Sequence, residues 1–115
     1  MVTAQSWKDV KFAVDFARNN NVRLVIKNTG HDFMGKSIGA GSLSIWTHKL
    51  KEFEVIENYS AKGTPYNGPA AKIGAAWQVG DLYAELEKHG MVAMGGECAV
   101  SCLSSHQSEA IGLLT

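Results

Sequence analysis

The residues best suited to chemistry lie in one glycine-rich stretch, residues 28–42. Four of the 12 glycines of the chain fall between Gly30 and Gly41. Glycine lets backbone N–H groups converge on an anion because no Cβ stands in the way, which is the geometry of a phosphate-binding nest. The same stretch also holds hydroxyl and ammonium donors, namely Thr29, Lys36, Ser37 and Ser42. Its composition therefore indicates anion binding, with a plain surface connection as the open alternative.

The length of this stretch also favours a function, because long connections inside a compact domain tend to be functional or disordered. We expect neither of the two familiar phosphate fingerprints, the P-loop and the Rossmann loop. No GxGxxG run opens a helix after the strand that precedes the stretch, so a Rossmann site is not predicted. Any anion site here is thus expected to have another architecture.

A second group of reactive side chains lies near the end of the chain. Cys98, Cys102 and His106 follow one another at helical spacing and could share one face as metal ligands. The spacing is not that of a zinc finger and no fourth ligand is evident, so we predict no metal site. Among the remaining candidates, His48 and His89 are predicted to be surface residues without a local partner, and we expect Trp46 and Trp77 in a core or interface.

The elements that must position these residues begin with a helix. Ser6 and Asp9 have the spacing of a capping box. Apolar residues follow at helical intervals, with two phenylalanines widening the apolar face: Val10, Phe12, Ala13, Val14, Phe16 and Ala17. Runs of strand type flank the helix at residues 2–4 and 22–26. Strand, helix and strand in this order predict a parallel βαβ unit ahead of the glycine-rich stretch.

Further elements are expected downstream of the glycine-rich stretch. Residues 43–46 predict a strand, and residues 53–57 and 70–75 predict an antiparallel pair joined by a long turn. Residues 78–89 predict a second helix that ends at Gly90, with one face made of Val79, Leu82, Tyr83 and Leu86. Residues 91–94 predict a last strand. The expected fold class is α+β, a βαβ unit plus antiparallel strands.

Composition excludes several classes of partner. The chain has 115 residues, 11 basic and 11 acidic side chains and a formal net charge of zero. This length supports one domain at most. Without a basic cluster, neither nucleic acid nor an anionic membrane surface is an expected partner. No apolar run approaches the ~20 residues of a membrane span, and the first residues lack the pattern of a signal peptide.

The run from Ile26 to Ser37, IKNTGHDFMGKS, resembles the flavin-attachment loop of the vanillyl-alcohol oxidase superfamily. Within that superfamily it is most similar to the berberine-bridge-enzyme-like FAD-linked oxidoreductases of fungi. The runs GSLSIWTH at residues 41–48 and GAAWQ at residues 74–78 also match. The resemblance covers residues 2–98 and implies the first half of an FAD-binding domain of the p-cresol methylhydroxylase (PCMH) type.

The resemblance implies FAD as the cofactor and identifies the residues that would hold it. His31 matches the histidine that bonds covalently to the flavin 8α-methyl carbon in many members. This bond needs a neutral imidazole nitrogen, which histidine supplies over much of the physiological pH range. Cys98 lies near the position where some members bond a cysteine sulfur to the flavin 6-carbon, with a small buried apolar residue as the open alternative. The residues implied to cradle the pyrophosphate are Asn28, Thr29, Gly30, Asp32, Gly35, Lys36 and Ser37.

The chain departs from the family after Cys98. Relatives continue with a VGxxGG run, which residues 99–115 lack, and with a substrate domain that is absent here. We therefore expect a partial FAD-binding domain over residues 1–98. Residues 99–115 are expected to be an out-of-family tail with no fixed structure.

Two functions remain open at this point. In the first, the chain binds FAD as part of an FAD-linked oxidoreductase, in which hydride passes from a substrate C–H to the flavin and dioxygen reoxidises it. The alternative is a non-catalytic fragment without the substrate domain. We expect this chain alone to be inactive, with FAD as its partner and a small-molecule substrate only in the full-length enzyme. Neither the substrate nor the cellular location is predicted.

Overall fold

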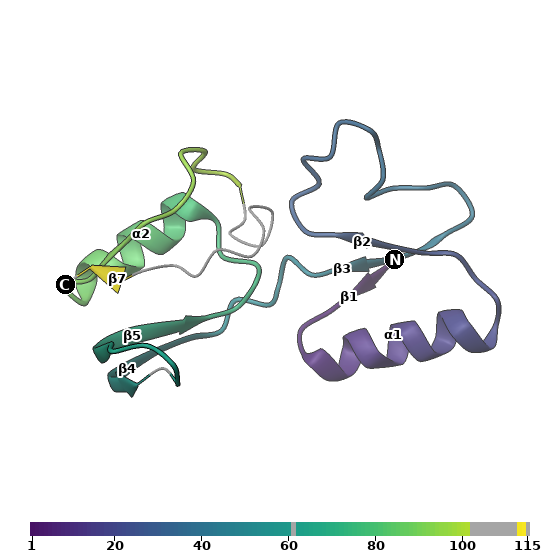
Figure 1. Cartoon of the computed structure of the whole chain (residues 1–115). Helices are drawn as coiled ribbons and strands as arrows, with labels where there is room; N and C mark the ends of the chain where they lie inside the picture. The colour runs from purple at the N-terminus through teal and green to yellow at the C-terminus, as the bar shows by residue number, and fades with distance from the viewer. Residues whose placement is uncertain (61, 102–112, 115) are drawn as a thin grey trace. The chain divides into compact units, whose positions relative to one another are not determined.

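The computed structural model describes residues 1–60, 62–101 and 113–114. The chain divides into two compact units, Met1–Leu50 and Lys51–Thr115 (Figure 1). Each unit has its own cluster of buried apolar side chains. The described residues form a parallel sheet of three strands and two antiparallel sheets of two strands each. The predicted α+β class is confirmed.

The first unit is built around a parallel sheet. Its elements in chain order are β1 (Val2–Thr3), α1 (Trp7–Asn19), β2 (Leu24–Lys27) and β3 (Leu43–Trp46). The strand order in the sheet is β1-β3-β2, with Val2 opposite Ile45 and Leu24 opposite Leu43. The predicted parallel βαβ unit is therefore present, and β3 lies between its two strands.

The predicted capping box determines where α1 begins. Oδ2 of Asp9 accepts hydrogen bonds from the backbone N–H of Gln5 at 3.0 Å and of Ser6 at 2.9 Å. The Ser6 hydroxyl donates to the same oxygen at 3.0 Å. The N–H of Gln5 and then the Ser6 hydroxyl hold the pKa of Asp9 below its ordinary value. The carboxylate thus satisfies donors at the helix start that no helical carbonyl can reach.

The buried face of α1 is narrower than the apolar pattern predicts. Ala13 and Ala17 are buried, whereas Phe12 and Phe16 are 76% and 54% exposed. Each phenylalanine directly precedes a buried alanine in the sequence. Neighbouring residues point about 100° apart around a helix axis, so the phenylalanines point away from the sheet that the alanines face. Small side chains at the contact let the helix approach closely, and the cluster there centres on Ile45, whose exposure is 0%.

The glycine-rich stretch connects β2 to β3, and its length has a topological cause. Because the two strands are parallel neighbours, the chain must return from the carboxyl end of β2 to the amino end of β3. Such a crossover needs a dozen or more residues and usually contains a helix. Here residues 28–42 make it without one. In Figure 1 this connection extends from the sheet on the side away from α1.

The second unit begins with an antiparallel pair. β4 (Phe53–Ser60) and β5 (Asn67–Ile73) pair with Phe53 opposite Ile73, and the register shifts between Ile56 and Tyr59. This confirms the predicted pair, although β4 is longer than expected and the turn between the strands is correspondingly shorter. The strand pair forms the surface against which the second helix packs.

The second helix, α2 (Val79–Lys88), has almost the predicted bounds and packs against this strand pair. Leu82 and Leu86 are each 1% exposed and form the unit's core with Met91. Tyr83, which the sequence pattern places on the same face, is 38% exposed. Partly buried apolar residues complete the cluster: Phe53, Val55, Ala71, Ile73, Trp77 and Ala93.

Two short strands end the described part of the chain. β6 (Val92–Ala93) pairs antiparallel with β7 (Leu113–Leu114). β7 falls inside the predicted tail, of which residues 102–112 and 115 lie outside the described residues. Over the described ranges, no helix has the length and apolar character needed to cross a membrane.

Candidate cofactor-binding loop

The loop of residues 28–42 is held at both ends by the sheet that it connects. At its start, the backbone N–H of Thr47 donates to the carbonyl of Lys27 at 2.8 Å and so extends the β2–β3 ladder. At its end, the guanidinium of Arg23 donates to the carbonyl of Ala40 at 2.7 Å. Both anchors belong to the sheet strands or to residues beside them, so the rigid part of the unit sets where the loop begins and ends.

Inside the loop, Asp32 organises a tight turn. Its backbone carbonyl accepts the N–H of Gly35 at 3.2 Å, and its carboxylate accepts the N–H of Lys36. The carbonyl of Gly35 in turn accepts the N–H of Ile38 at 3.2 Å. An aspartate whose side chain bonds its own backbone a few residues on is a common way to fix a turn. Asp32 therefore shapes the loop through its own backbone bonds.

Two glycines adopt backbone conformations that other residues rarely reach. Gly30 has φ +94° and Gly35 has φ +71°. At Gly30 an added Cβ would lie 2.9 Å from Cε of Lys27 and would also strain the backbone. The chain can therefore bend sharply at the two ends of the 30–35 segment only because glycine stands there.

The structure brings most of the predicted site residues together in this loop. The side chains of His31, Asp32 and Lys36 are exposed, and those of Asn28 and Ser37 are half-buried. The remaining loop residues of the predicted site are Thr29 and Gly35, which are half-buried, and Gly30, which is exposed. An imidazole, an ammonium group and hydroxyl donors are thus presented on one connection of the first unit.

The letters of residues 30–37, GHDFMGKS, do have the spacing GxxxxGK[ST] of a P-loop. A P-loop leads from a strand directly into a helix, whose N-terminus helps to bind the phosphates. Here no helix follows Ser37, and the next element is β3. The expectation that no P-loop occurs is therefore supported by the element order, whereas spacing alone would have predicted one.

Cys98 belongs to the second unit, where it begins a turn against the start of α2. The N–H of Ser101 donates to the carbonyl of Cys98 at 3.0 Å. The first helical N–H groups, those of Val79 and Gly80, donate to the carbonyls of Ser101 and Ala99, each at 3.0 Å. The helix N-terminus thus fixes the turn that carries the thiol.

The thiol of Cys98 is exposed and its surroundings favour the thiolate. The Ser101 hydroxyl, followed by the backbone N–H of Val100, holds the pKa of Cys98 below its ordinary value. Because both groups donate hydrogen bonds to sulfur, they stabilise its charged form. The small buried apolar residue that was the open alternative for Cys98 is therefore wrong.

The prediction that His48 and His89 lack local partners is also wrong. Nδ1 of His48 lies 3.3 Å from Oδ1 of Asn28, and the His48 ring stacks on Trp46. The ring of His89 stacks on Phe53 in the second unit. Asn28 and Phe53 are distant in sequence from these histidines and meet them only through the tertiary fold, so sequence patterns could not have found them, whereas Trp46 is two residues from His48.

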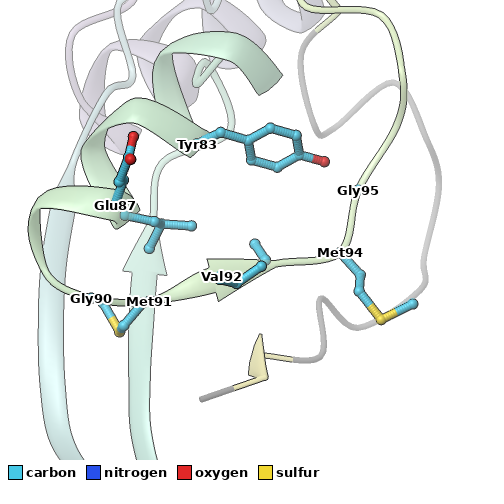
Figure 2. A pocket seen from close by; sticks show the side chains of 9 residues that line it. Tyr83, Glu87, Gly90, Met91, Val92, Met94 and Gly95 are labelled. Atoms are coloured by element: carbon cyan, nitrogen blue, oxygen red, sulfur yellow. The ribbon is translucent and has the colours of Figure 1, made fainter.

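A pocket of about 730 Å³ lies between α2 and β6 in the second unit (Figure 2). Figure 2 shows Tyr83 extending from α2 toward the segment of Gly95. Its lining is mostly apolar and contains none of the predicted site residues: Tyr83, Leu86, Glu87, Gly90, Met91, Val92, Ala93, Met94 and Gly95. Glu87 is the charged group of this lining, and a carboxylate disfavours an anionic ligand such as a pyrophosphate.

Within the described residues, no group of three or more His, Cys, Asp or Glu side chains is arranged to hold a metal ion. Of the candidate set Cys98, Cys102 and His106, the last two lie outside the described residues.

Comparison with known proteins identifies fungal flavoproteins as relatives. The chain is 46% identical over 104 residues to bifunctional decalin synthase calF of Penicillium decumbens. This match covers 90% of this chain and 18% of that protein. It is 48% identical over 98 residues to FAD-linked oxidoreductase patO of Aspergillus clavatus. This second match covers 85% of this chain and 17% of that protein. The chain thus spans less than a fifth of the length of these relatives.

The solved structures of similar fold are flavoproteins as well. The VAO-type flavoprotein MtVAO615 of Myceliophthora thermophila matches with a TM-score of 0.79 and 45% identity, over 86% of this chain and 18% of that one. MtVAO713 of the same fungus matches with a TM-score of 0.72 and 30% identity over the same shares. These matches confirm the predicted fold, the first part of a flavoprotein's FAD-binding domain.

A family model described as FAD binding domain matches residues 1–112. The match continues beyond residue 98, and the boundary expected there stays a prediction, because most of the tail lies outside the described residues. With the family model, the fungal relatives and the solved flavoproteins in agreement, FAD is the cofactor to which this fold corresponds. The chain belongs to the FAD binding domain family.

Proposed function

We propose that this chain binds FAD through the loop of residues 28–37, which holds the pyrophosphate, and attaches the flavin covalently through His31. The observation that carries the proposal is the glycine-bent loop between β2 and β3, which presents cationic, hydroxyl and imidazole groups together. It takes the place of the helix that such a crossover usually contains.

The residues of the loop fit a pyrophosphate. Gly30, with φ +94°, gives the loop a bend that residues with a side chain rarely adopt. Lys36 is exposed and supplies a positive charge, while Thr29 and Ser37 supply hydroxyl donors. The carboxylate of Asp32 accepts the N–H of Lys36, so this negative charge is bonded within the loop. The donor set therefore suits an anion.

His31 is the group proposed to form the covalent bond. Its side chain is exposed on the loop, so a flavin ring can approach it without displacing core residues. A neutral imidazole nitrogen is a nucleophile near neutral pH, whereas a lysine amine is protonated there. We extend the proposal to Cys98 as a second attachment point, because its exposed thiol is stabilised as the thiolate by Ser101 and Val100.

The activity proposed for the whole protein is that of an FAD-linked oxidoreductase. When bound, FAD supplies the hydride-accepting chemistry, and dioxygen is proposed to reoxidise it. This chain would contribute the loop that orients the cofactor. The alternative is a non-catalytic FAD-binding fragment, because the chain covers only 17% of FAD-linked oxidoreductase patO.

Attachment is tested by expressing the 115-residue chain with FAD and precipitating it with acid. We expect flavin absorbance in the washed pellet of Cys98→Ser, where His31 is the attachment point, and its loss when His31→Ala is added, because noncovalent FAD stays in the supernatant. His89→Ala, a histidine substitution in the other unit, should keep the colour. Colour that survives in His31→Ala but disappears in Cys98→Ser would move the attachment to sulfur. A native chain that takes up no FAD would contradict the proposal.

A further inference from the structure

The carboxyl end of β3 contacts the first residue of the loop through two side chains. The indole Nε1–H of Trp46 donates to the backbone carbonyl of Asn28 at 2.9 Å. Nδ1 of His48 lies 3.3 Å from Oδ1 of Asn28, and because an amide oxygen only accepts, Nδ1 is the donor. The backbone and the side chain of Asn28 are therefore each held from β3.

The register of the sheet accounts for this arrangement. Trp46 lies opposite Lys27 in the parallel ladder, so its side chain reaches the residue just beyond the end of β2. His48 follows two residues later, in a turn in which the N–H of Leu50 donates to the carbonyl of Thr47 at 3.0 Å. The rings of Trp46 and His48 stack with centroids 5.7 Å apart and an interplanar angle of 15°. The stack keeps both donors in line with Asn28.

Water competes only partly for these bonds, because Asn28, Trp46 and His48 are all half-buried. Two residues further on, the chain turns at Gly30 with φ +94°. A residue fixed in both backbone and side chain just before such a turn sets the direction in which the turn begins. The geometry therefore links β3 to the shape of the loop.

We propose that Trp46 and His48 are positioning residues of the cofactor loop, which fix Asn28 and through it the entry of the chain into the turn at Gly30. The inference rests on the proposed function, since the loop holds FAD only under that proposal. Both residues act through Asn28, and contact with the cofactor is assigned to neither of them.

The first test compares FAD affinity by flavin fluorescence titration in the 115-residue chain carrying His31→Ala and Cys98→Ser, so that binding stays noncovalent and a Kd can be measured. Trp46→Phe keeps an aromatic ring for the stack and removes the N–H donor together with part of the indole. We expect its Kd to rise about five- to tenfold, the effect of one lost hydrogen bond in a partly buried site. Trp77→Phe is the matched control, because Nε1 of Trp77 donates to the carbonyl of Glu52 at 3.0 Å in the other unit.

A second measurement follows Asn28 without FAD. The backbone amide of Thr29 is bonded to the carbonyl carbon of Asn28, so its signal in ¹⁵N-resolved NMR spectra reports on the Asn28 carbonyl. We expect this signal to shift in Trp46→Phe, which loses the donor, and to stay in place in Trp77→Phe, which keeps it. His48→Gln keeps a side-chain N–H donor and His48→Leu does not. The glutamine variant should therefore bind FAD more tightly than the leucine variant.

These outcomes separate the inference from the proposed function. A native chain that binds no FAD contradicts the proposed function, and the inference then fails if the Thr29 signal is unmoved in Trp46→Phe. If the native chain binds FAD, equal affinities with and without Trp46→Phe in the His31→Ala, Cys98→Ser background overturn the inference. An equal loss of affinity in Trp77→Phe overturns it as well, since the effect would then be one of general stability.

Discussion

At the scale of single residues, Cys98 shows how a turn prepares a side chain for chemistry. Its thiol accepts a hydrogen bond from the Ser101 hydroxyl, and Ser101 itself is only 8% exposed. The turn is fixed because the start of α2 bonds its carbonyls. This donor stabilises the thiolate, so a larger fraction of the thiol is ionised at a given pH than at an ordinary cysteine.

Replacement of Ser101 by alanine should raise the pKa of Cys98, because the largest cause of the lowered value is removed. The rate of alkylation by iodoacetamide against pH measures this, in a Cys102→Ser background so that one thiol reports. We expect the rise in rate with pH to occur at higher pH in Ser101→Ala. Ser60→Ala, an exposed serine on β4, is the control. Identical profiles for all three proteins would show that the hydroxyl does not act on the thiol.

The loop could be recognised from the sequence residue by residue, but its supports could not. Clustered glycines, Lys36 and the resemblance around His31 predict an anion and flavin site from neighbouring letters alone. The bonds from Trp46 and His48 to Asn28 join residues that are 18 and 20 positions apart. They exist only because β3 pairs with β2, and this pairing was not among the predictions.

At the scale of elements, the helices were the most predictable parts. The predicted helix of residues 78–89 is observed as Val79–Lys88, and the strand at residues 43–46 has the predicted bounds. Local periodicity and caps suffice for such elements. The strand order β1-β3-β2 and the exposure of Phe12 depend on contacts far along the chain, which periodicity does not encode.

The start of α1 should make stability depend on pH. The pKa of Asp9 is lowered in the folded chain, mainly by the N–H of Gln5. Its contribution is therefore present above the unfolded pKa of about 3.9 and is lost as pH falls through the lower folded value. We expect Asp9→Asn to lower the melting temperature at neutral pH, and the gap to the native chain to close in acid. Circular dichroism melts over this pH range measure both effects.

The control for this prediction is Asp81→Asn, which changes an aspartate in the first turn of α2. The carboxylate of Asp81 contacts Nζ of Lys51 at 3.1 Å, an exposed ion pair that contributes little to stability. We expect a smaller change in melting temperature than for Asp9→Asn. If the difference in melting temperature between Asp9→Asn and the native chain stays constant as the pH is lowered, the assignment of the Asp9 carboxylate as the helix cap is contradicted.

At the scale of the whole molecule, the chain has two separate cores. One centres on Ile45 and Ala13, the other on Leu82 and Leu86. Leu82→Ala should destabilise the second unit by about 2–5 kcal/mol, the usual cost of a cavity at a buried leucine. We expect amide hydrogen exchange to speed up most in β4, β5 and α2, which pack around that cavity.

Val92→Ala is the matched control, since Val92 is 63% exposed and exposed substitutions change stability by roughly 0.5 kcal/mol or less. Exchange that accelerates equally in α1 and α2 of Leu82→Ala would argue against separate cores.

The position of β3 between β1 and β2 also constrains the order of folding. β1 and β2 each pair with β3, and Val2 meets its partner Ile45 only when most of the first unit is in place. Pairing between residues so distant in the chain is slow, because a long loop must close first. When β3 enters, it completes the sheet, and in the same event it closes residues 28–42 into their loop. The parallel sheet of the first unit and the shape of its candidate cofactor-binding loop therefore depend on the pairing of the same strand, β3.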